Sequence, residues 1–341
     1  MLTDFSEKVQ KVKSLIDAKG EIVIVSHHNP DGDALGSMLG LYHVLKLYGV
    51  ESSMILPNAF PAFLKWLPDS KKVVNFFYNP AKAKALIKNA KVLFAVDFNS
   101  PSRLEEMGQW FDKATGKKVL IDHHPFPEPS FHIAISDTEV SSTAELVYEF
   151  ALELGGQDLI NYNAAISLFV GIMTDTGSFS YSCSYPRTFE IAAQLIQKGV
   201  KVEDAQRRVY NTFSADRMRL LGYALEKKMR VFSEHNAAYI SLTRKELVSF
   251  NHKIGDTEGL VNQPLAIQGI VLSALFVEND GYIKVSLRSR GQFPANKLCK
   301  EFFNGGGHIN AAGGKSFHSL EETEKLFEKA LHQYHNELTQ E

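Results

Sequence analysis

Residues 21–34 have the sequence EIVIVSHHNPDGDA, in which a short apolar run leads into a polar turn. The run is apolar without interruption from residue 22 to residue 25, which is typical of a β-strand buried on both faces. Residues 34–48 then carry apolar side chains at helical spacing, and Gly49 closes the pattern. The segment therefore predicts a buried strand, a tight turn and a helix in direct succession.

The rest of the first half repeats this alternation. A further strand is expected at residues 54–56, and further buried strands are expected at residues 91–96 and 118–121. Later helices are expected at residues 142–153, 162–173 and 187–198, followed by a long helical stretch over residues 202–231. Alternating strands and helices are typical of a parallel, doubly wound α/β sheet.

The sequence pattern changes near residue 233, which indicates a second domain. Strands are expected at residues 237–242, 274–277 and 282–287, before a glycine-rich loop at 305–308 and a charged helix at 320–336. This pattern predicts a smaller α/β domain. We therefore predict a catalytic domain over residues 1–187, a helical linker over residues 188–232 and a second domain over residues 233–341.

Composition limits the classes of protein to be considered. The 341 residues carry a net charge of -2, with 44% hydrophobic and 22% charged residues, as in an ordinary folded protein without a duplex DNA surface. No apolar run reaches the roughly 18 to 20 residues of a membrane span, and the N-terminus does not resemble a signal peptide. Two cysteines, Cys183 and Cys299, fit a reducing compartment, so we expect a cytoplasmic protein.

Acidic and imidazole side chains follow the predicted strands at their carboxyl ends, where open α/β sheets bind ligands. They are His27, Asp31, Asp33, Asp97, Asp122, His123 and His124, and Asp175 ends a predicted helix. Taken alone, Asp33 is equally consistent with a helix N-cap, and the alternative for Asp97 is a helix cap or a surface ion pair. Five carboxylates brought together would repel one another without cations, and mixed oxygen and nitrogen ligands suit Mn²⁺, Fe²⁺ or Zn²⁺. The set predicts a two-metal phosphoesterase.

The order of these residues resembles that of the DHH phosphoesterase superfamily, and residues 305–313, GGGHINAAG, resemble its DHHA1 domain. The resemblance covers nearly the whole chain. It implies a DHH domain joined by a helical connector to a DHHA1 domain, with the active site in the cleft between them. The similarity is greatest to bacterial members that degrade very short RNAs (nanoRNA), dephosphorylate 3′-phosphoadenosine 5′-phosphate, or cleave linear and cyclic dinucleotides.

The resemblance also implies roles for individual residues. His27, Asp31 and Asp97 would hold one metal ion, while Asp33, Asp97, His123 and Asp175 would hold a second, with Asp97 shared. His124 would contact the scissile phosphate, and Asp122 would support it. The substrate would be bound by Arg103, Arg288, Arg290, Gly305, Gly306, Gly307 and His308. The expected cofactors are two divalent ions, Mn²⁺ first, with Mg²⁺, Fe²⁺ or Co²⁺ as alternatives, and a homodimer is implied.

The basic segment from Lys284 to Lys300 contains no acidic residue, and by charge alone it fits an anion site or a solvated face equally well. The resemblance favours the anion site. We therefore predict hydrolysis of short single-stranded RNA and of bisphosphonucleotides. The alternatives are a cyclic-dinucleotide phosphodiesterase, a pyrophosphatase or exopolyphosphatase, and a non-catalytic nucleotide sensor. The aromatic residues Phe60, Phe63 and Trp66 are expected to pack in the core rather than to stack on a base.

Overall fold

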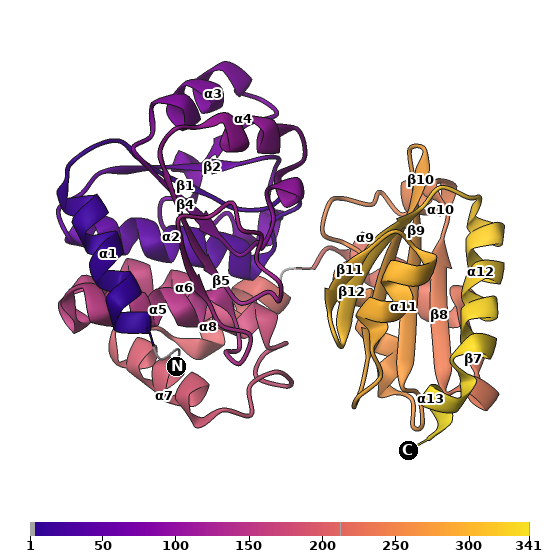
Figure 1. Cartoon of the computed structure of the whole chain (residues 1–341). Coiled ribbons are helices and arrows are strands. Elements are labelled where there is room, and N and C mark those ends of the chain that lie inside the picture. The colour runs from indigo at the N-terminus through magenta and orange to yellow at the C-terminus, as the bar shows by residue number, and fades with distance from the viewer. Residues whose placement is uncertain (1–3, 212, 341) are drawn as a thin grey trace. The chain divides into compact units, whose positions relative to one another are not determined.

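The computed structural model describes residues 4–211 and 213–340, and the chain forms two compact units, Met1–Thr212 and Phe213–Glu341 (Figure 1). The boundary between the units falls inside the segment predicted as a linker. Among the helices of the described residues, none has both the length and the hydrophobicity of a membrane span.

The first unit contains a six-stranded sheet in which every pair of neighbouring strands is parallel. The strand order is β3-β2-β1-β4-β5-β6. The strands are β1 (Ile22–Val25), β2 (Ser52–Leu56), β3 (Val74–Asn75), β4 (Val92–Val96), β5 (Lys117–Asp122) and β6 (Ile133–Ser136). This confirms the predicted doubly wound α/β sheet. The order reverses between β1 and β4, and such a switch point opens a crevice at the carboxyl ends of the two strands.

Helices cover both faces of this sheet. They are α1 (Phe5–Asp17), α2 (Gly32–Leu47), α3 (Pro80–Asn89), α4 (Gly108–Lys113), α5 (Thr143–Gly155), α6 (Tyr162–Asp175), α7 (Pro186–Gln197) and α8 (Val202–Tyr210). Alternate residues of β1 face opposite cores, because Ile22 and Ile24 pack with α2, α5 and α6 while Val23 and Val25 pack with α3 and α4. This is why the sequence of β1 is apolar at every position.

Helix α2 lies in the centre of the first core, where every residue from Gly32 to Leu45 is buried. It approaches α6 closely at Gly36, since a Cβ atom there would lie 2.6 Å from the carbonyl oxygen of Ser167 and 2.8 Å from the backbone nitrogen of Gly171. Glycine at both positions therefore lets the two helices come close enough to bring their charged ends together.

The second unit contains a mixed sheet of six strands, in the order β11-β12-β10-β9-β8-β7. The strands are β7 (Met229–Phe232), β8 (Ala237–Leu242), β9 (Leu272–Asn279), β10 (Tyr282–Ser289), β11 (Gly306–His308) and β12 (Ala311–Ser316). The helices are α9 (Ala215–Tyr223), α10 (Arg244–Ser249), α11 (Ala295–Phe302), α12 (Leu320–Gln333) and α13 (His335–Thr339). The strands β8 and β9 are parallel, and the other pairs are antiparallel.

Two sequence predictions are wrong in detail. The long helical stretch over residues 202–231 is interrupted after Tyr210, restarts at Ala215, and ends in a π-helical turn (Ala224–Lys228) and strand β7. Ser214 begins the second helix by accepting a hydrogen bond from the backbone nitrogen of Arg217 at 3.0 Å, and β7 pairs with β8. The expected loop at 305–308 is mostly strand β11, because Gly306–His308 pair with β12. Strand β7 pairs with the next strand, β8, and β11 pairs with the next strand, β12, so strand pairing overrides local sequence preference in both places.

The aromatic prediction is confirmed. Phe60, Phe63 and Trp66 pack against the first core.

Candidate active site

The sequence-predicted residues of the first unit meet at the carboxyl edge of the sheet, at the switch point between β1 and β4. His27 follows β1, Asp97 follows β4, and Asp122 ends β5 immediately before His123 and His124. Asp31 and Asp33 lie at the start of α2, and Asp175 is the last residue of α6.

Three groups of these residues each bring ligand atoms within 4.8 Å of one another. The groups are His27 with Asp31 and Asp97, Asp33 with His123 and Asp175, and Asp97 with Asp122 and His124.

Asp33 is fixed by the amino end of another helix. One carboxylate oxygen accepts hydrogen bonds from the backbone nitrogen of Ala144 at 2.9 Å and from the Ser37 hydroxyl at 3.0 Å. The other accepts from the backbone nitrogen of Thr143 at 2.7 Å. The positive end of α5 thus stabilises a buried carboxylate. The N-cap alternative for Asp33 is wrong, since the N-cap of α2 is Asp31.

Asp97 lies at the centre of the cluster. Its backbone φ is 65°, a left-handed conformation that is rare outside glycine and often marks a functional position. One carboxylate oxygen lies 3.4 Å from Nε2 of His27, and the other lies 3.7 Å from Nε2 of His123. The Thr143 hydroxyl donates to the second oxygen at 2.9 Å. The alternative of a surface ion pair is therefore wrong, because Asp97 is buried among imidazoles.

Hydrogen bonds orient two of the histidines. Nδ1 of His27 lies 2.9 Å from the carbonyl oxygen of His28, and because a carbonyl can only accept, this ring nitrogen carries the proton. Nε2 of His27 is then the ring nitrogen that could accept a metal ion, and it lies 3.4 Å from a carboxylate oxygen of Asp97. Nδ1 of His124 lies 2.8 Å from a carboxylate oxygen of Asp122, which fixes this ring in the same way.

The pKa values show how strongly the carboxylates interact. Burial, followed by the charges of Asp97 and Asp175, raises the pKa of Asp33 well above its usual range. Burial also acts to raise the pKa of Asp97, but the hydrogen bond from His27 and the charges of the histidines outweigh it and lower this pKa. Burial favours the neutral form of His27, yet its bond to Asp97 raises its pKa, against the opposing charge of Arg103.

The residues fit divalent cations. Oxygen and nitrogen donors converge in a largely buried cluster, where the charge of Asp33 is unfavourable without a cation. Among the described residues, Oδ2 of Asp122 and the hydroxyl of Ser26 are buried beside this cluster without a hydrogen-bond partner. Buried polar atoms are normally satisfied, so these atoms indicate that the cluster accommodates further polar ligands.

Adding Mn²⁺ is expected to raise the melting temperature by about 5 to 10 °C at saturation, and more at pH 8 than at pH 5.5. The raised pKa of Asp33 means that its stabilising contribution to the metal-free protein is present at low pH and is lost as pH rises through the folded pKa. Metal ions bind the deprotonated carboxylate and offset this loss. Differential scanning fluorimetry in EDTA and in Mn²⁺ measures both shifts. Equal shifts at the two pH values would contradict the prediction, and Asp33→Asn should reduce the difference between them.

The predicted substrate residues divide between the two units. In the first unit, Arg103 is half-buried in a 3₁₀ segment (Pro101–Met107), and its carbonyl oxygen accepts a hydrogen bond from the backbone nitrogen of His28 at 2.8 Å. This bond ties the loop after β4 to the loop after β1. The charge of Arg103 acts on His27, so it belongs to the same edge of the sheet.

In the second unit, Arg288 on β10 and His308 on β11 both lie opposite Ala311 of β12. Residues opposite one another in antiparallel strands project from the same face, so the two side chains share a face of the sheet. Gly305 precedes β11, and Arg290 is exposed just after β10. Gly307 has a φ of 140° and lies against the carbonyl of Ala311, so a side chain there would be strained. Gly306 lies between Gly305 and Gly307 and is the first residue of β11.

Sequence reasoning missed Thr143, whose backbone contacts Asp33 and whose hydroxyl contacts Asp97. A signal was present, because the N-terminus of a helix binds anions and the helix starting at residue 142 was expected. It also missed Gly36, whose close approach to Gly171 only the packing of α2 on α6 reveals.

Comparisons with known proteins concern these same segments. The model of the DHH family, N-terminal domain, matches residues 21–172, and the model of the DHHA1 domain matches residues 239–337. The first match contains every residue of the cluster except Asp175. The second contains Arg288, Arg290 and residues 305–308.

Three similar proteins cover nearly the whole chain. A Thermus thermophilus protein named bifunctional oligoribonuclease and PAP phosphatase NrnA is 29% identical over 98% of this chain and 95% of its own. A Bacillus subtilis protein of the same name is 28% identical over 89% of this chain and 92% of its own. The crystal structure of an exopolyphosphatase-related protein from Bacteroides fragilis is 43% identical, covers 97% of both chains and has a TM-score of 0.93.

Proposed function

This chain belongs to the DHH family and carries a DHHA1 domain, and on that premise we propose that it is a two-metal phosphodiesterase and phosphatase. Its substrates are short oligoribonucleotides, linear dinucleotides and 3′-phosphoadenosine 5′-phosphate. The observation that carries the proposal is the buried cluster around Asp97, which combines the donor atoms of a two-metal site. The names of the relatives that match nearly the whole chain support this choice of substrates.

In this proposal, His27, Asp31 and Asp97 hold one ion, and Asp33, Asp97, His123 and Asp175 hold the other. Mn²⁺ is the proposed metal, since it accepts both carboxylate and imidazole ligands. Bound divalent ions of this kind supply activation of water and neutralisation of charge on the phosphate.

The protein's own groups orient the substrate and control protons. Asp122 holds the Nδ1 proton of His124 at 2.8 Å, so that Nε2 of His124 is presented to an oxygen of the scissile phosphate. Thr143 and the amino end of α5 fix Asp97 and Asp33, so that neither carboxylate must reorganise during the reaction. Asp97, Asp122 and His124 are therefore the proposed catalytic residues.

The remaining residues bind the substrate away from the scissile bond. Arg103 contacts the nucleotide beside His27. Arg288 and Arg290 supply planar cations, and Gly305, Gly306, Gly307 and His308 bind a second phosphate through backbone amides and an imidazole. A second anchor explains a preference for very short chains, because it limits how far a substrate can extend. We also propose that the protein acts in the cytoplasm on single-stranded substrates and that it forms a homodimer.

A substrate panel tests the proposed function. We expect purified protein with Mn²⁺ to release mononucleotides from di- to pentaribonucleotides, with rates that fall by about tenfold or more for chains of ten or longer. It should also release phosphate from 3′-phosphoadenosine 5′-phosphate. The rates are measured by chromatography of labelled substrates and by phosphate release. Absence of mononucleotide would overturn the proposal.

The panel includes pyrophosphate and short polyphosphate, because the Bacteroides fragilis relative is named exopolyphosphatase-related. A higher kcat/KM on these than on dinucleotides would establish that second function instead. Tight nucleotide binding without turnover would show that the protein is a non-catalytic nucleotide sensor.

A further inference from the structure

An aromatic ring projects from the loop that follows the catalytic histidines. Phe126 lies two residues after His124, and 87% of its surface is exposed. Its φ of 59° is in the left-handed region, which is disfavoured for a bulky residue. Prolines at 125 and 127 restrict the backbone on both sides of it. A turn that only reversed the chain would need neither a strained backbone nor an exposed aromatic ring, so this conformation points to a functional role for Phe126.

Hydrogen bonds fix the backbone on each side of Phe126. The side-chain amide of Asn99 donates to the carbonyl oxygen of Pro125 at 2.7 Å. The carbonyl oxygen of Asn99 accepts from the backbone nitrogen of Glu128 at 2.9 Å. Phe98, the residue before Asn99, is fully buried against two further aromatic rings. Phe126 is therefore presented by a rigid turn that is tied to the strand end carrying Asp97.

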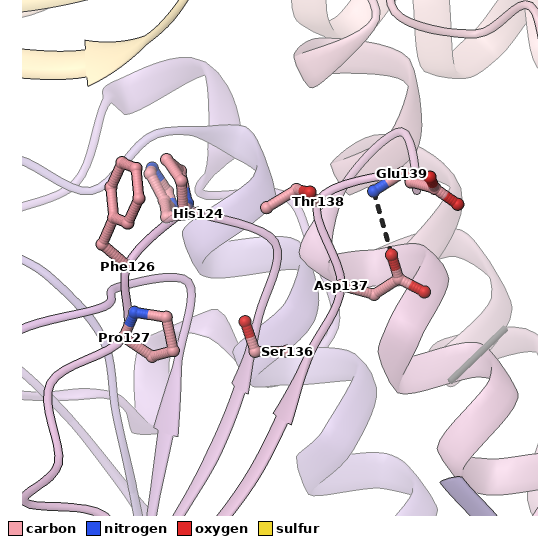
Figure 2. A pocket seen from close by; sticks show the side chains of 8 residues that line it. His124, Phe126, Pro127, Ser136, Asp137, Thr138 and Glu139 are labelled. Atoms are coloured by element: carbon pink, nitrogen blue, oxygen red, sulfur yellow. Dashed lines mark hydrogen bonds between the residues drawn. The ribbon is translucent and has the colours of Figure 1, made fainter. Parts of the chain in front are cut away.

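The ring lines a pocket together with His124 (Figure 2). The pocket is also lined by residues 136–139, which supply two hydroxyls and the carboxylates of Asp137 and Glu139. Asp137 is held in place because its carboxylate accepts from the backbone nitrogen of Glu139 at 2.9 Å. Carboxylates repel phosphate groups, but they accept hydrogen bonds from the amino and imino groups of nucleobases. A pocket lined by an exposed aromatic ring and by hydrogen-bond acceptors thus fits a base better than a phosphate.

We propose that Phe126 is the stacking platform for the base of the nucleotide whose phosphate His124 contacts. Two residues of extended chain span at most about 7 Å, which is the scale of one nucleotide. Every base has a flat face, so stacking tolerates different sequences and matches an enzyme that clears mixed short RNAs. The inference rests on the proposed function, because it requires a nucleotide at His124.

The test compares substrates with and without a base. A diadenylate and its analogue that lacks the base next to the scissile phosphate are hydrolysed by the wild type, Phe126→Ala and Phe126→Trp. For the diadenylate, Phe126→Ala should raise KM by about 5- to 100-fold, while Phe126→Trp should stay near the wild type or bind more tightly. For the baseless analogue, the wild type should already show the higher KM, and Phe126→Ala should add little to it.

Phe77→Ala is the matched control, since Phe77 is 74% exposed in the same unit but lies outside the pocket. It should leave KM at the wild-type value. An equal rise in KM for both substrates in Phe126→Ala would overturn the inference, because the residue would then act only through the loop. Unchanged KM values would overturn it as well.

Equilibrium binding separates this inference from the proposed function. In the Phe126→Trp protein, the introduced indole should be quenched by adenosine 5′-monophosphate in Mn²⁺ but not by ribose 5-phosphate, and the two native tryptophans of the wild type should not respond. If the wild type hydrolysed no nucleotide yet this quenching occurred, the proposed function would fail and the base site would stand. If the wild type hydrolysed nucleotides but this quenching did not occur, the proposed function would stand and the base site would fail.

Discussion

Replacing Asp97 by asparagine should lower the rate of hydrolysis of a dinucleotide by about 10³-fold or more, equivalent to ~4 kcal/mol of barrier. Asparagine preserves the shape of the side chain and can still accept the hydrogen bond from Thr143, but it carries no charge. In the wild type, one carboxylate oxygen of Asp97 lies 3.4 Å from Nε2 of His27 and the other lies 3.7 Å from Nε2 of His123. Asparagine would place an amide group in this position. Both proposed metal positions lose the same ligand, which is why a single substitution has so large an effect.

The measurement is kcat/KM on a dinucleotide, together with the number of Mn²⁺ ions bound per chain, which should fall below two. Asp112→Asn is the control, because Asp112 is an exposed carboxylate in the same unit. It should retain full activity and full metal content. The melting temperature of Asp97→Asn in EDTA should stay within a few degrees of the wild type, which separates loss of the site from misfolding. More than a tenth of wild-type activity with bound Mn²⁺ would refute the central role of Asp97.

The sequence predicts the sheet of the first unit well because a parallel strand is buried on both faces. An uninterrupted apolar run as short as residues 22–25 or 92–96 strongly favours such a strand, and the residue that follows it must lie at the carboxyl edge. The side chains that meet at Asp97 could therefore be identified from local patterns, even though β1 and β4 are far apart in the chain.

Other features depend on contacts that no local pattern encodes. Asp33 owes its environment to the amino end of α5, 110 residues away in the sequence. Strands β7 and β11 are short, and β11 consists of two glycines and a histidine, so pairing with a neighbouring strand defines them. Phe126 is visible in the sequence only as a phenylalanine between prolines, and it is the folded chain that shows its ring exposed beside His124.

Replacing Gly36 by alanine should destabilise the protein by about 1–3 kcal/mol and reduce activity by about 10²-fold. The new Cβ atom would lie 2.6 Å from the carbonyl oxygen of Ser167 and 2.9 Å from the Cα atom of Gly171. These are backbone atoms, so no rotamer change can relieve the contact and α2 must move away from α6. Asp33 lies one turn before Gly36 on α2, and Asp175 lies one turn after Gly171 on α6. A separation of the helices therefore pulls apart two carboxylates that meet at His123.

Two other glycines distinguish this effect from a general cost of substitution. The three atoms nearest to a Cβ atom at Gly40, one turn further along α2, all belong to the side chain of Leu168, and a side chain can shift more readily than the backbone that Gly36 faces. Gly40→Ala should therefore cost less stability and leave the affinity for Mn²⁺ close to that of the wild type. At Gly222 in α9 a Cβ atom would meet nothing within 4 Å, so Gly222→Ala should stabilise the protein by up to ~1 kcal/mol. Guanidinium unfolding measures the stability of the three variants, and Mn²⁺ titration measures their metal affinity. Gly36→Ala is the only one of the three that forces backbone apart beside the cluster, so only this variant should lose both stability and affinity for Mn²⁺. If Gly36→Ala matched Gly40→Ala in both properties, helix spacing would not position the site.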